Sequence, residues 1–185
     1  ILISGKKDFI AGADIKSFKV EKVGDFQPFS RKGHELLQKI EDSKKPIVSA
    51  IHGTCYGLGV ELSLACNARV CSNDSKTKLA LPEVKLGLLP GGGGTQRLPR
   101  LVGLQASLDM MLTGKNIFAF KAKKIGLVDD VVHQSKLHKA AKKIVLDIAD
   151  NNFKRKKLKK SLGVKLLDGT SLGRSIVFSQ AKKTV

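Results

Sequence analysis

Short apolar runs alternate with longer amphipathic stretches along the 185 residues of the chain. The runs at residues 1–4, 47–51 and 68–72 are apolar and too short for helices, so they predict buried strands. Residues 78–81 and 127–132 predict two further strands of the same kind.

The clearest helical pattern covers residues 28–42, where Leu36, Leu37 and Ile40 share one face and Pro46 follows the end. Further helices are predicted at residues 58–67, 96–101, 104–112 and 119–125. From residue 137 to 185 the pattern is helical with no new strand. Because strands alternate with helices, the sequence predicts an α/β fold with a largely parallel sheet.

Composition adds a strong positive charge to this picture. Lys and Arg outnumber Asp and Glu by 34 to 16, which gives a net charge of +18. Such a charge attracts polyanions, among them nucleic acid, an anionic membrane surface and a phosphate-rich small molecule. The alternative is that the excess positive charge consists of lysines on a solvent-exposed face that bind no ligand. No apolar run is long enough to span a membrane.

The basic residues gather toward the end of the chain and are densest at residues 154–160. Proteins that bind nucleic acid usually interleave basic and aromatic residues, and here only Phe153 lies beside the run. A polyanion-binding module formed by residues 151–185 is therefore a minor hypothesis, and we expect no specific nucleic-acid partner.

The three cysteines, Cys55, Cys66 and Cys71, form no CxxC pair and no Cys/His ligand spacing. We therefore expect no metal site. Buried, reduced thiols in a reducing compartment agree best with this odd number.

Glu61 follows a glycine-containing turn, Gly57-Leu58-Gly59, at the predicted start of a helix. A helix N-terminus offers free backbone N–H groups that can bind a developing oxyanion. Glu61 would lie one helical turn from Leu58 and could act as a general base on a water molecule. A glutamate that only stabilises the helix dipole is the structural alternative. The third glycine of a dinucleotide fingerprint would fall at Leu62, so we expect no NAD binding in this segment.

Glu83 lies in an irregular segment flanked by Leu81, Val84 and Leu86. An apolar setting raises the pKa of a carboxyl group and favours a proton donor. Glu61 and Glu83 could then divide the roles of base and acid, although a solvent-facing glutamate is an equally simple interpretation of Glu83. Residues 90–94 are rich in glycine but lack the Gly-Lys-Ser/Thr ending of a phosphate-binding loop, so we expect them to shape a pocket wall.

Several segments together resemble the enoyl-CoA hydratase/isomerase (crotonase) family in order and spacing. They are residues 11–15 (AGADI), 51–55 (IHGTC), 59–62 (GVEL), 81–91 (LPEVKLGLLPG), 93–99 (GGTQRLP), 112–115 (LTGK) and 126–129 (GLVD). Within the family, the set is most similar to the hydratase part of the alpha subunits of bacterial fatty-acid oxidation complexes of the anaerobic type. The resemblance covers residues 1–143, and it implies a crotonase-like core of ββα repeats with a spiral sheet.

The resemblance implies a hydratase that adds water to a 2-trans-enoyl-CoA and gives a 3-hydroxyacyl-CoA, with 3,2-enoyl-CoA isomerisation as a further activity. Glu61 matches the family's water-activating glutamate, and Glu83 matches the glutamate that protonates C2. The backbone N–H groups of Ala13 and Leu58 match the oxyanion-hole donors. The positions implied to bind substrate or CoA are Ala13, Asp14, Ile15, Lys16, Leu58 and Gly91.

The resemblance also sets expectations for organisation. Residues 1–105 would form the crotonase core without its first strands, residues 106–150 a helical region for oligomerisation and pocket covering, and residues 151–185 a Lys-rich helical linker toward a dehydrogenase domain absent from the chain. The implied partners are an acyl-CoA substrate, further copies of the chain or a thiolase beta subunit, with no permanently bound cofactor. The implied location is the bacterial cytoplasm or the mitochondrial matrix.

Leu58 stands where the family usually has glycine, and the chain begins with Ile1 inside a predicted strand. A catalytically impaired fragment that serves only in binding or assembly is therefore the alternative to an active hydratase.

Overall fold

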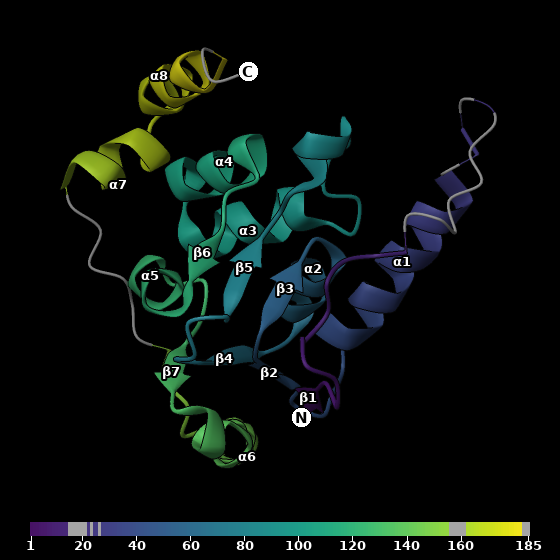
Figure 1. Ribbon diagram of the computed structural model, residues 1–185. Coiled ribbons are helices and arrows are strands. Elements are labelled where there is room, and N and C mark those ends of the chain that lie inside the picture. The colour runs from purple at the N-terminus through teal and green to yellow at the C-terminus, as the bar shows by residue number, and fades with distance from the viewer. Residues whose placement is uncertain (15–21, 23, 26, 156–161, 183–185) are drawn as a thin grey trace.

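The computed structural model describes residues 1–14, 22, 24–25, 27–155 and 162–182. Two small sheets lie at an angle to each other, and helices surround them (Figure 1). Ile15 and Lys16 and most of the Lys-rich run at residues 154–160 lie outside the described residues.

The first sheet has four parallel strands in the order β1 (Leu2–Ile3), β2 (Val48–Ile51), β4 (Ala68–Ser72) and β7 (Asp130–Val132). β2 and β4 are fully buried, as expected for the central strands of a parallel sheet. The predicted α/β fold with a largely parallel sheet is confirmed. The last strand is shorter than predicted, because the N–H groups of Leu127 and Val128 both donate to Ala122 O at the end of the preceding helix.

The second sheet consists of β3 (Thr54–Tyr56), β5 (Lys78–Ala80) and β6 (Ile117–Phe118). β3 pairs in parallel with β5, and β5 pairs antiparallel with β6. Ile10 adds an isolated parallel bridge to Cys55, which draws the chain before residue 14 alongside β3. The pairs β2–β3 and β4–β5 are each followed by helical structure, as the resemblance to ββα repeats implied.

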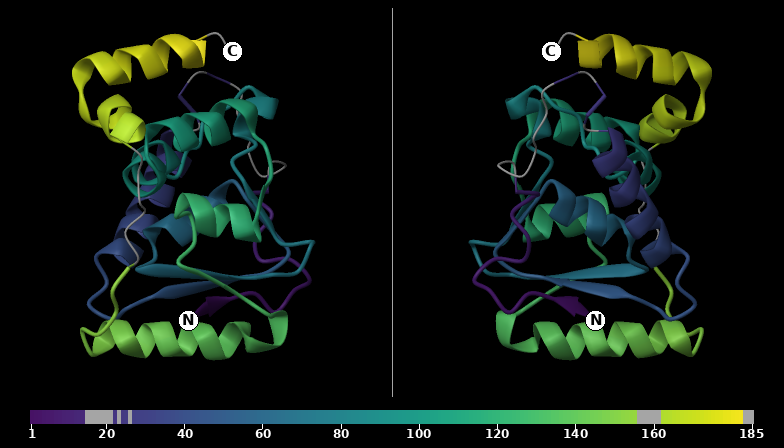
Figure 2. Two further views of the ribbon diagram at one scale, coloured as in Figure 1. Left: turned by 90° about the vertical axis from the view of Figure 1, so that its left-hand side faces the viewer. Right: turned by 90° about the vertical axis from the view of Figure 1, so that its right-hand side faces the viewer.

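Helices cover the first sheet on both faces, as the side views of Figure 2 show. On one face α6 (Leu137–Ala149) packs Leu137 and Ala141 against Val48, Ala50 and Val70. On the other face lies the larger core. Its buried members include Phe9, Ile51, Cys55, Val60, Cys71, Leu79, Leu81, Leu98, Met110 and Leu127.

The remaining helices are α1 (Gln27–Glu41), α2 (Leu58–Ala65), η2 (Glu83–Leu86), α3 (Gly94–Val102), α4 (Leu104–Thr113), α5 (Ala119–Ile125), η3 (Gln134–Lys136), α7 (Leu162–Gly169) and α8 (Ser171–Lys182). Most of them agree with the hydrophobic pattern, but the short helices η2 and η3 were not predicted, and the segment of Glu83 was expected to be irregular. α5 is capped by Gly126, which follows its last residue in a left-handed conformation with φ of 77°. α2 ends two residues before the predicted position, since Asn67 bonds Ile47 through both its backbone N–H and its side-chain oxygen.

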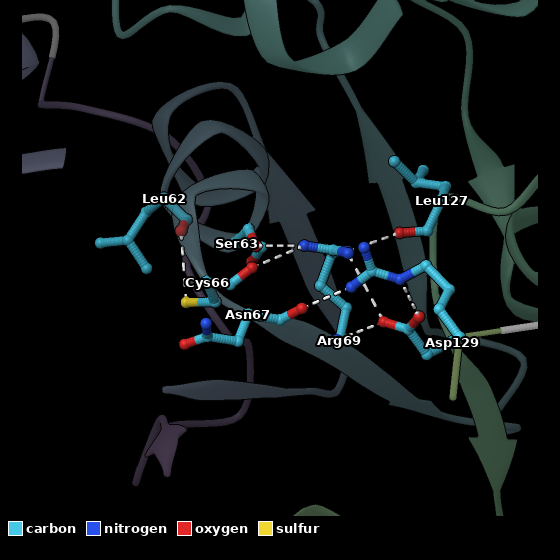
Figure 3. A network of polar contacts seen from close by, with 8 residues as sticks. Leu62, Ser63, Cys66, Asn67, Arg69, Leu127 and Asp129 are labelled. Carbon is cyan, nitrogen blue, oxygen red and sulfur yellow. Dashed lines mark hydrogen bonds and ion pairs between the residues drawn. The ribbon is translucent and has the colours of Figure 1, made fainter. Parts of the chain in front are cut away.

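A buried arginine joins α2 to the first sheet (Figure 3). The Arg69 side chain is 2% exposed and donates to the carbonyl oxygens of Ser63, Cys66 and Leu127. Asp129 accepts the Arg69 backbone N–H at 2.9 Å and forms an ion pair with its guanidinium at 3.5 Å. Burial lowers the pKa of Arg69 to about 10, and Asp129 opposes that shift.

Cys55, Cys66 and Cys71 are buried free thiols, which agrees with the sequence interpretation. Burial raises the pKa of Cys55 and Cys71 to about 12 and that of Cys66 to about 11, so these thiols stay protonated at neutral pH. In the part of the chain that the structure describes, no helix combines the length and the apolar character that crossing a membrane requires.

Candidate active site

Glu61 lies in the first turn of α2, and its side chain is buried with 2% exposure. One oxygen, Oε1, accepts hydrogen bonds from the backbone N–H groups of Gly92 and Gly94, each at 2.8 Å. The pKa of Glu61 is raised, mainly by burial, and the two N–H groups together with His34 and Arg97 offset part of that rise. Glu61 is therefore a buried carboxylate with fixed donors, which goes beyond the role of a helix-dipole residue.

The glycine loop of residues 91–94 explains why the sequence is so rich in glycine there. A Cβ on Gly92 would lie 2.7 Å from Glu61 Oε2, and one on Gly94 would lie 3.0 Å from Glu61 Oε1. A side chain at either position would displace the carboxylate or the loop. The sequence indicated only a pocket wall, and it did not reveal that this loop holds Glu61.

The turn before α2 also requires glycine. Gly57 has φ of 51°, and its N–H donates to Ala80 O in β5. A Cβ on Gly59 would lie 2.5 Å from Ile10 O, so the helix start packs directly on the backbone before Ala13. Leu58 is the first residue of α2, and the helix therefore offers its N–H no acceptor.

Glu83 begins the short helix η2 and is half-buried. A Cβ on Gly57 would lie 3.1 Å from Glu83 Oε1 and 3.7 Å from Gly12 Cα, so the carboxyl group faces the turn between β3 and α2. Glu83 Oε2 is buried and has no hydrogen-bond partner among the described residues. The pKa of Glu83 is raised to about 7, mainly by burial; its own backbone N–H opposes the rise, and the charge of Glu61 adds to it.

The structure thus brings together Glu61, Glu83, the turn at Leu58 and the segment that leads to Ala13. Ala13 is half-buried and directly follows Gly12, whereas Asp14 is exposed. The predicted substrate-binding positions Ile15 and Lys16 cannot be placed, because they lie outside the described residues.

Gly91, another predicted binding position, makes contacts that the sequence did not suggest. Its carbonyl oxygen accepts from Ser30 Oγ at 3.2 Å and from His34 Nε2 at 2.5 Å, both in α1. The amphipathic pattern of α1 predicts the helix itself, but it does not indicate that the helix contacts the glycine loop.

A groove of about 620 Å³ lies beside the glycine loop. His34, Gly93, Arg97 and Arg100 line it, but Glu61 and Glu83 do not. The two carboxyl groups therefore lie outside this groove. Within the described ranges, no group of three or more His, Cys, Asp or Glu side chains could hold a metal ion.

Comparison with known proteins decides the family. The family model described as enoyl-CoA hydratase/isomerase matches residues 1–175. The chain belongs to the enoyl-CoA hydratase/isomerase family. Its α/β architecture is accordingly the crotonase fold, as the resemblance implied.

Curated relatives of this hydratase/isomerase chain include the fatty acid oxidation complex subunit alpha of Shewanella putrefaciens and that of Shewanella amazonensis. Each is 54% identical over 187 residues and covers 100% of this chain. The chain spans about a quarter (26%) of the length of these relatives.

Solved structures of enoyl-CoA hydratases share the fold of this family member. The enzyme from Bacillus anthracis is 32% identical with a TM-score of 0.72, and the match covers 98% of this chain and 70% of that one. The enzyme from Thermoplasma volcanium is 30% identical with a TM-score of 0.72, over 98% and 70% of the two chains.

Proposed function

We propose that the protein is an enoyl-CoA hydratase of fatty-acid oxidation, which adds water to a 2-trans-enoyl-CoA thioester. The observation that carries the proposal is the convergence of two carboxyl groups with different pKa environments beside a helix start. Glu61 is held by two backbone N–H groups, and Glu83 directs Oε1 toward the turn at Gly57, while its buried Oε2 has no hydrogen-bond partner among the described residues. Membership of the enoyl-CoA hydratase/isomerase family supports the same reaction.

In the proposed reaction the thioester carbonyl accepts hydrogen bonds from the N–H groups of Ala13 and Leu58. Negative charge develops on that oxygen as water attacks C3, and each well-placed donor contributes about 3 kcal/mol to stabilising it. Leu58 retains its backbone donor although the family usually has glycine there. Its side chain is half-buried, so it would narrow the space beside the carbonyl.

The two glutamates would exchange protons with the reacting water and with C2. Glu61 takes one proton from the water while the hydroxyl oxygen bonds to C3, and Glu83 gives its proton to C2. A pKa of about 7 keeps much of Glu83 protonated at neutral pH, which suits a proton donor. The same carboxyl group could move a proton between C2 and C4, so 3,2-enoyl-CoA isomerisation is a second candidate activity of the site.

The relatives named as subunits of a fatty acid oxidation complex support a further part of the proposal. We infer that this chain also acts within a larger assembly, with a thiolase subunit as the proposed partner and residues 106–150 as the proposed helical region for assembly. We infer a bacterial cytoplasmic location from the bacterial sources of these relatives.

The test compares single-atom changes in the two carboxyl groups. Glu61→Gln and Glu83→Gln should each lower the rate of crotonyl-CoA hydration by at least about 100-fold, the contribution expected of a positioned acid or base. Glu35→Gln, an exposed change in α1, is the matched control and should retain full activity. Circular dichroism would establish that all three variants fold.

Full turnover in both carboxyl variants would contradict the assignment of roles. A folded wild-type protein that binds CoA but does not hydrate crotonyl-CoA would favour the alternative of a catalytically impaired fragment.

A further inference from the structure

The carbonyl group of Gly91 is held from α1 by two side chains. Ser30 Oγ donates to it at 3.2 Å, and His34 Nε2 contacts it at 2.5 Å. A carbonyl oxygen can only accept, so His34 Nε2 must carry a proton and donate it. One turn of α1 therefore supplies both donors to a single backbone oxygen.

The same peptide group points its N–H at Glu61. The Gly91 carbonyl and the Gly92 N–H belong to one planar unit, and this N–H donates to Glu61 Oε1 at 2.8 Å. Donors on the carbonyl side polarise the unit and strengthen the hydrogen bond on the N–H side. The unit thus links two side chains of α1 to the carboxylate of Glu61 in a continuous hydrogen-bonded chain.

The second donor to Glu61 is fixed in a different way. The Gly94 N–H shares its peptide group with Gly93 O, and that oxygen accepts from the N–H groups of Gln96 and Arg97 at the start of α3. One donor is therefore anchored by side chains of α1 and the other by the backbone of α3. Only the first can be removed by substituting a side chain without disturbing the glycine loop itself.

We propose that His34 and Ser30 are positioning residues for the reaction, which act through the Gly91–Gly92 peptide group to fix and polarise the hydrogen bond to Glu61. This inference rests on the proposed function insofar as it concerns turnover. Its structural part, the control of Glu61 by α1, can be measured without turnover.

Several groups besides the His34 donor influence the pKa of Glu61. The electrostatic effect of Arg97 and His34 lowers the pKa of Glu61, whereas Glu61 itself raises the pKa of Glu83. Arg97 is held by an ion pair with Glu41 at 2.8 Å and donates to Gly92 O, so it stays in place when His34 is changed. Loss of the His34 donor should therefore raise the pKa of Glu61 while the other groups are unchanged.

The experiment compares His34→Leu, which removes the donor, with His34→Gln, which keeps a neutral donor on a side chain of similar reach. Ser30→Ala removes the second donor and serves as an independent variant if His34→Leu does not fold. His138→Leu and Ser75→Ala are matched controls, because both residues are exposed and lie far along the chain from the glycine loop.

Two readouts apply to every variant. The first is kcat and KM for crotonyl-CoA. The second is the titration of the Glu61 carboxyl by ¹³C NMR of glutamate-labelled protein, with the resonance assigned from Glu61→Gln.

We expect His34→Leu to lower kcat by roughly tenfold, the effect of weakening one hydrogen bond to a charged group, with little change in KM. We also expect a higher Glu61 pKa in His34→Leu, a smaller change of the same sign in Ser30→Ala, and recovery of kcat in His34→Gln. The controls should match the wild type in both readouts.

An unchanged Glu61 titration in a folded His34→Leu protein would overturn the inference. So would a His34→Gln variant with the same kcat loss as His34→Leu, because the ring rather than its donor would then be what matters. If the wild type does not hydrate crotonyl-CoA, the proposed function fails, whereas the NMR titration still decides whether α1 controls Glu61.

Discussion

The carboxyl group of Glu83 has a pKa of about 7, because burial raises it and the negative charge of Glu61 adds to that increase. Two carboxyl groups that share a site lose their protons one after the other, and the second proton is held more tightly. Glu61, with two N–H donors at 2.8 Å, is the group better suited to carry the charge. The site therefore favours one ionised and one protonated carboxyl at neutral pH.

The coupling between the two groups predicts the effect of removing one charge. In Glu61→Gln the pKa of Glu83 should fall below about 7, because the neutral amide no longer opposes ionisation while the effect of burial remains. The Glu83 carboxyl signal in ¹³C NMR would measure the shift, and Glu35→Gln in α1 is the control. A Glu83 titration that is identical in Glu61→Gln and wild type would show that the two carboxyl groups do not interact.

The same pKa predicts the pH dependence of activity. A raised pKa means that the proton stays on Glu83 up to about pH 7 and is lost as the pH rises through that value. Hydration that requires this proton should be present below about pH 7 and should decrease by about tenfold per pH unit well above it. Initial rates of crotonyl-CoA hydration across the range, expressed as kcat/KM, would test this, with thermal unfolding at each pH as the control for folding. A kcat/KM that does not change from pH 6 to about 9 would show that Glu83 is not the proton donor.

Much of the fold could be predicted because apolar periodicity is a local signal. α1, α4 and α5 each lie within one residue of the predicted limits, and the four strands of the first sheet were all expected. β3 and β6 were not predicted, because each leads within two residues into a helix and does not stand out as a separate apolar run. The early start predicted for β7 failed because Leu127 and Val128 are apolar but bond back to the end of α5.

The sequence predicted the two carboxyl groups of the candidate site, but it did not predict their hydrogen-bond partners. Glu61 and Glu83 stand in recognisable local motifs. By contrast, the donors to Glu61 come from Gly92 and Gly94, which are 31 and 33 residues further along the chain. The catalytic and binding roles of these residues stay predictions until the variants are measured.

The contact between Gly59 and Ile10 gives a prediction for stability. A Cβ on Gly59 would lie 2.5 Å from Ile10 O and 2.9 Å from Ile10 Cβ, so Gly59→Ala must push α2 away from the segment that leads to Ala13. Overpacking of this kind typically costs about 1–3 kcal/mol. Urea unfolding would measure the loss.

Gly33→Ala is the matched control for that substitution. Gly33 lies inside α1, and a Cβ there would have no neighbour within 4 Å. The change should stabilise the protein by about 0.5–1 kcal/mol through helix propensity. Equal unfolding free energies for Gly59→Ala and Gly33→Ala would contradict the close packing at Gly59.

The final prediction concerns the ion pair of Arg69 with Asp129. Asp129→Ala would leave the Arg69 guanidinium, which is 2% exposed, without its counter-charge. An uncompensated buried charge destabilises a protein by about 3–5 kcal/mol, although the three carbonyl acceptors of Arg69 remain. Chemical denaturation of the variant and the wild type would measure the difference in unfolding free energy.

The other arginine on Asp129 provides the comparison. Arg155 donates to Asp129 Oδ1 at 2.6 Å, but its side chain is 43% exposed. Arg155→Gln should therefore cost less than about 1 kcal/mol, as for other solvent-exposed ion pairs. The double variant Arg69→Met/Asp129→Leu should recover much of the stability lost in Asp129→Ala, because no buried charge then remains. If Asp129→Ala and Arg155→Gln prove equally mild, the buried carbonyl acceptors alone are sufficient to hold Arg69, and Asp129 is not its essential partner.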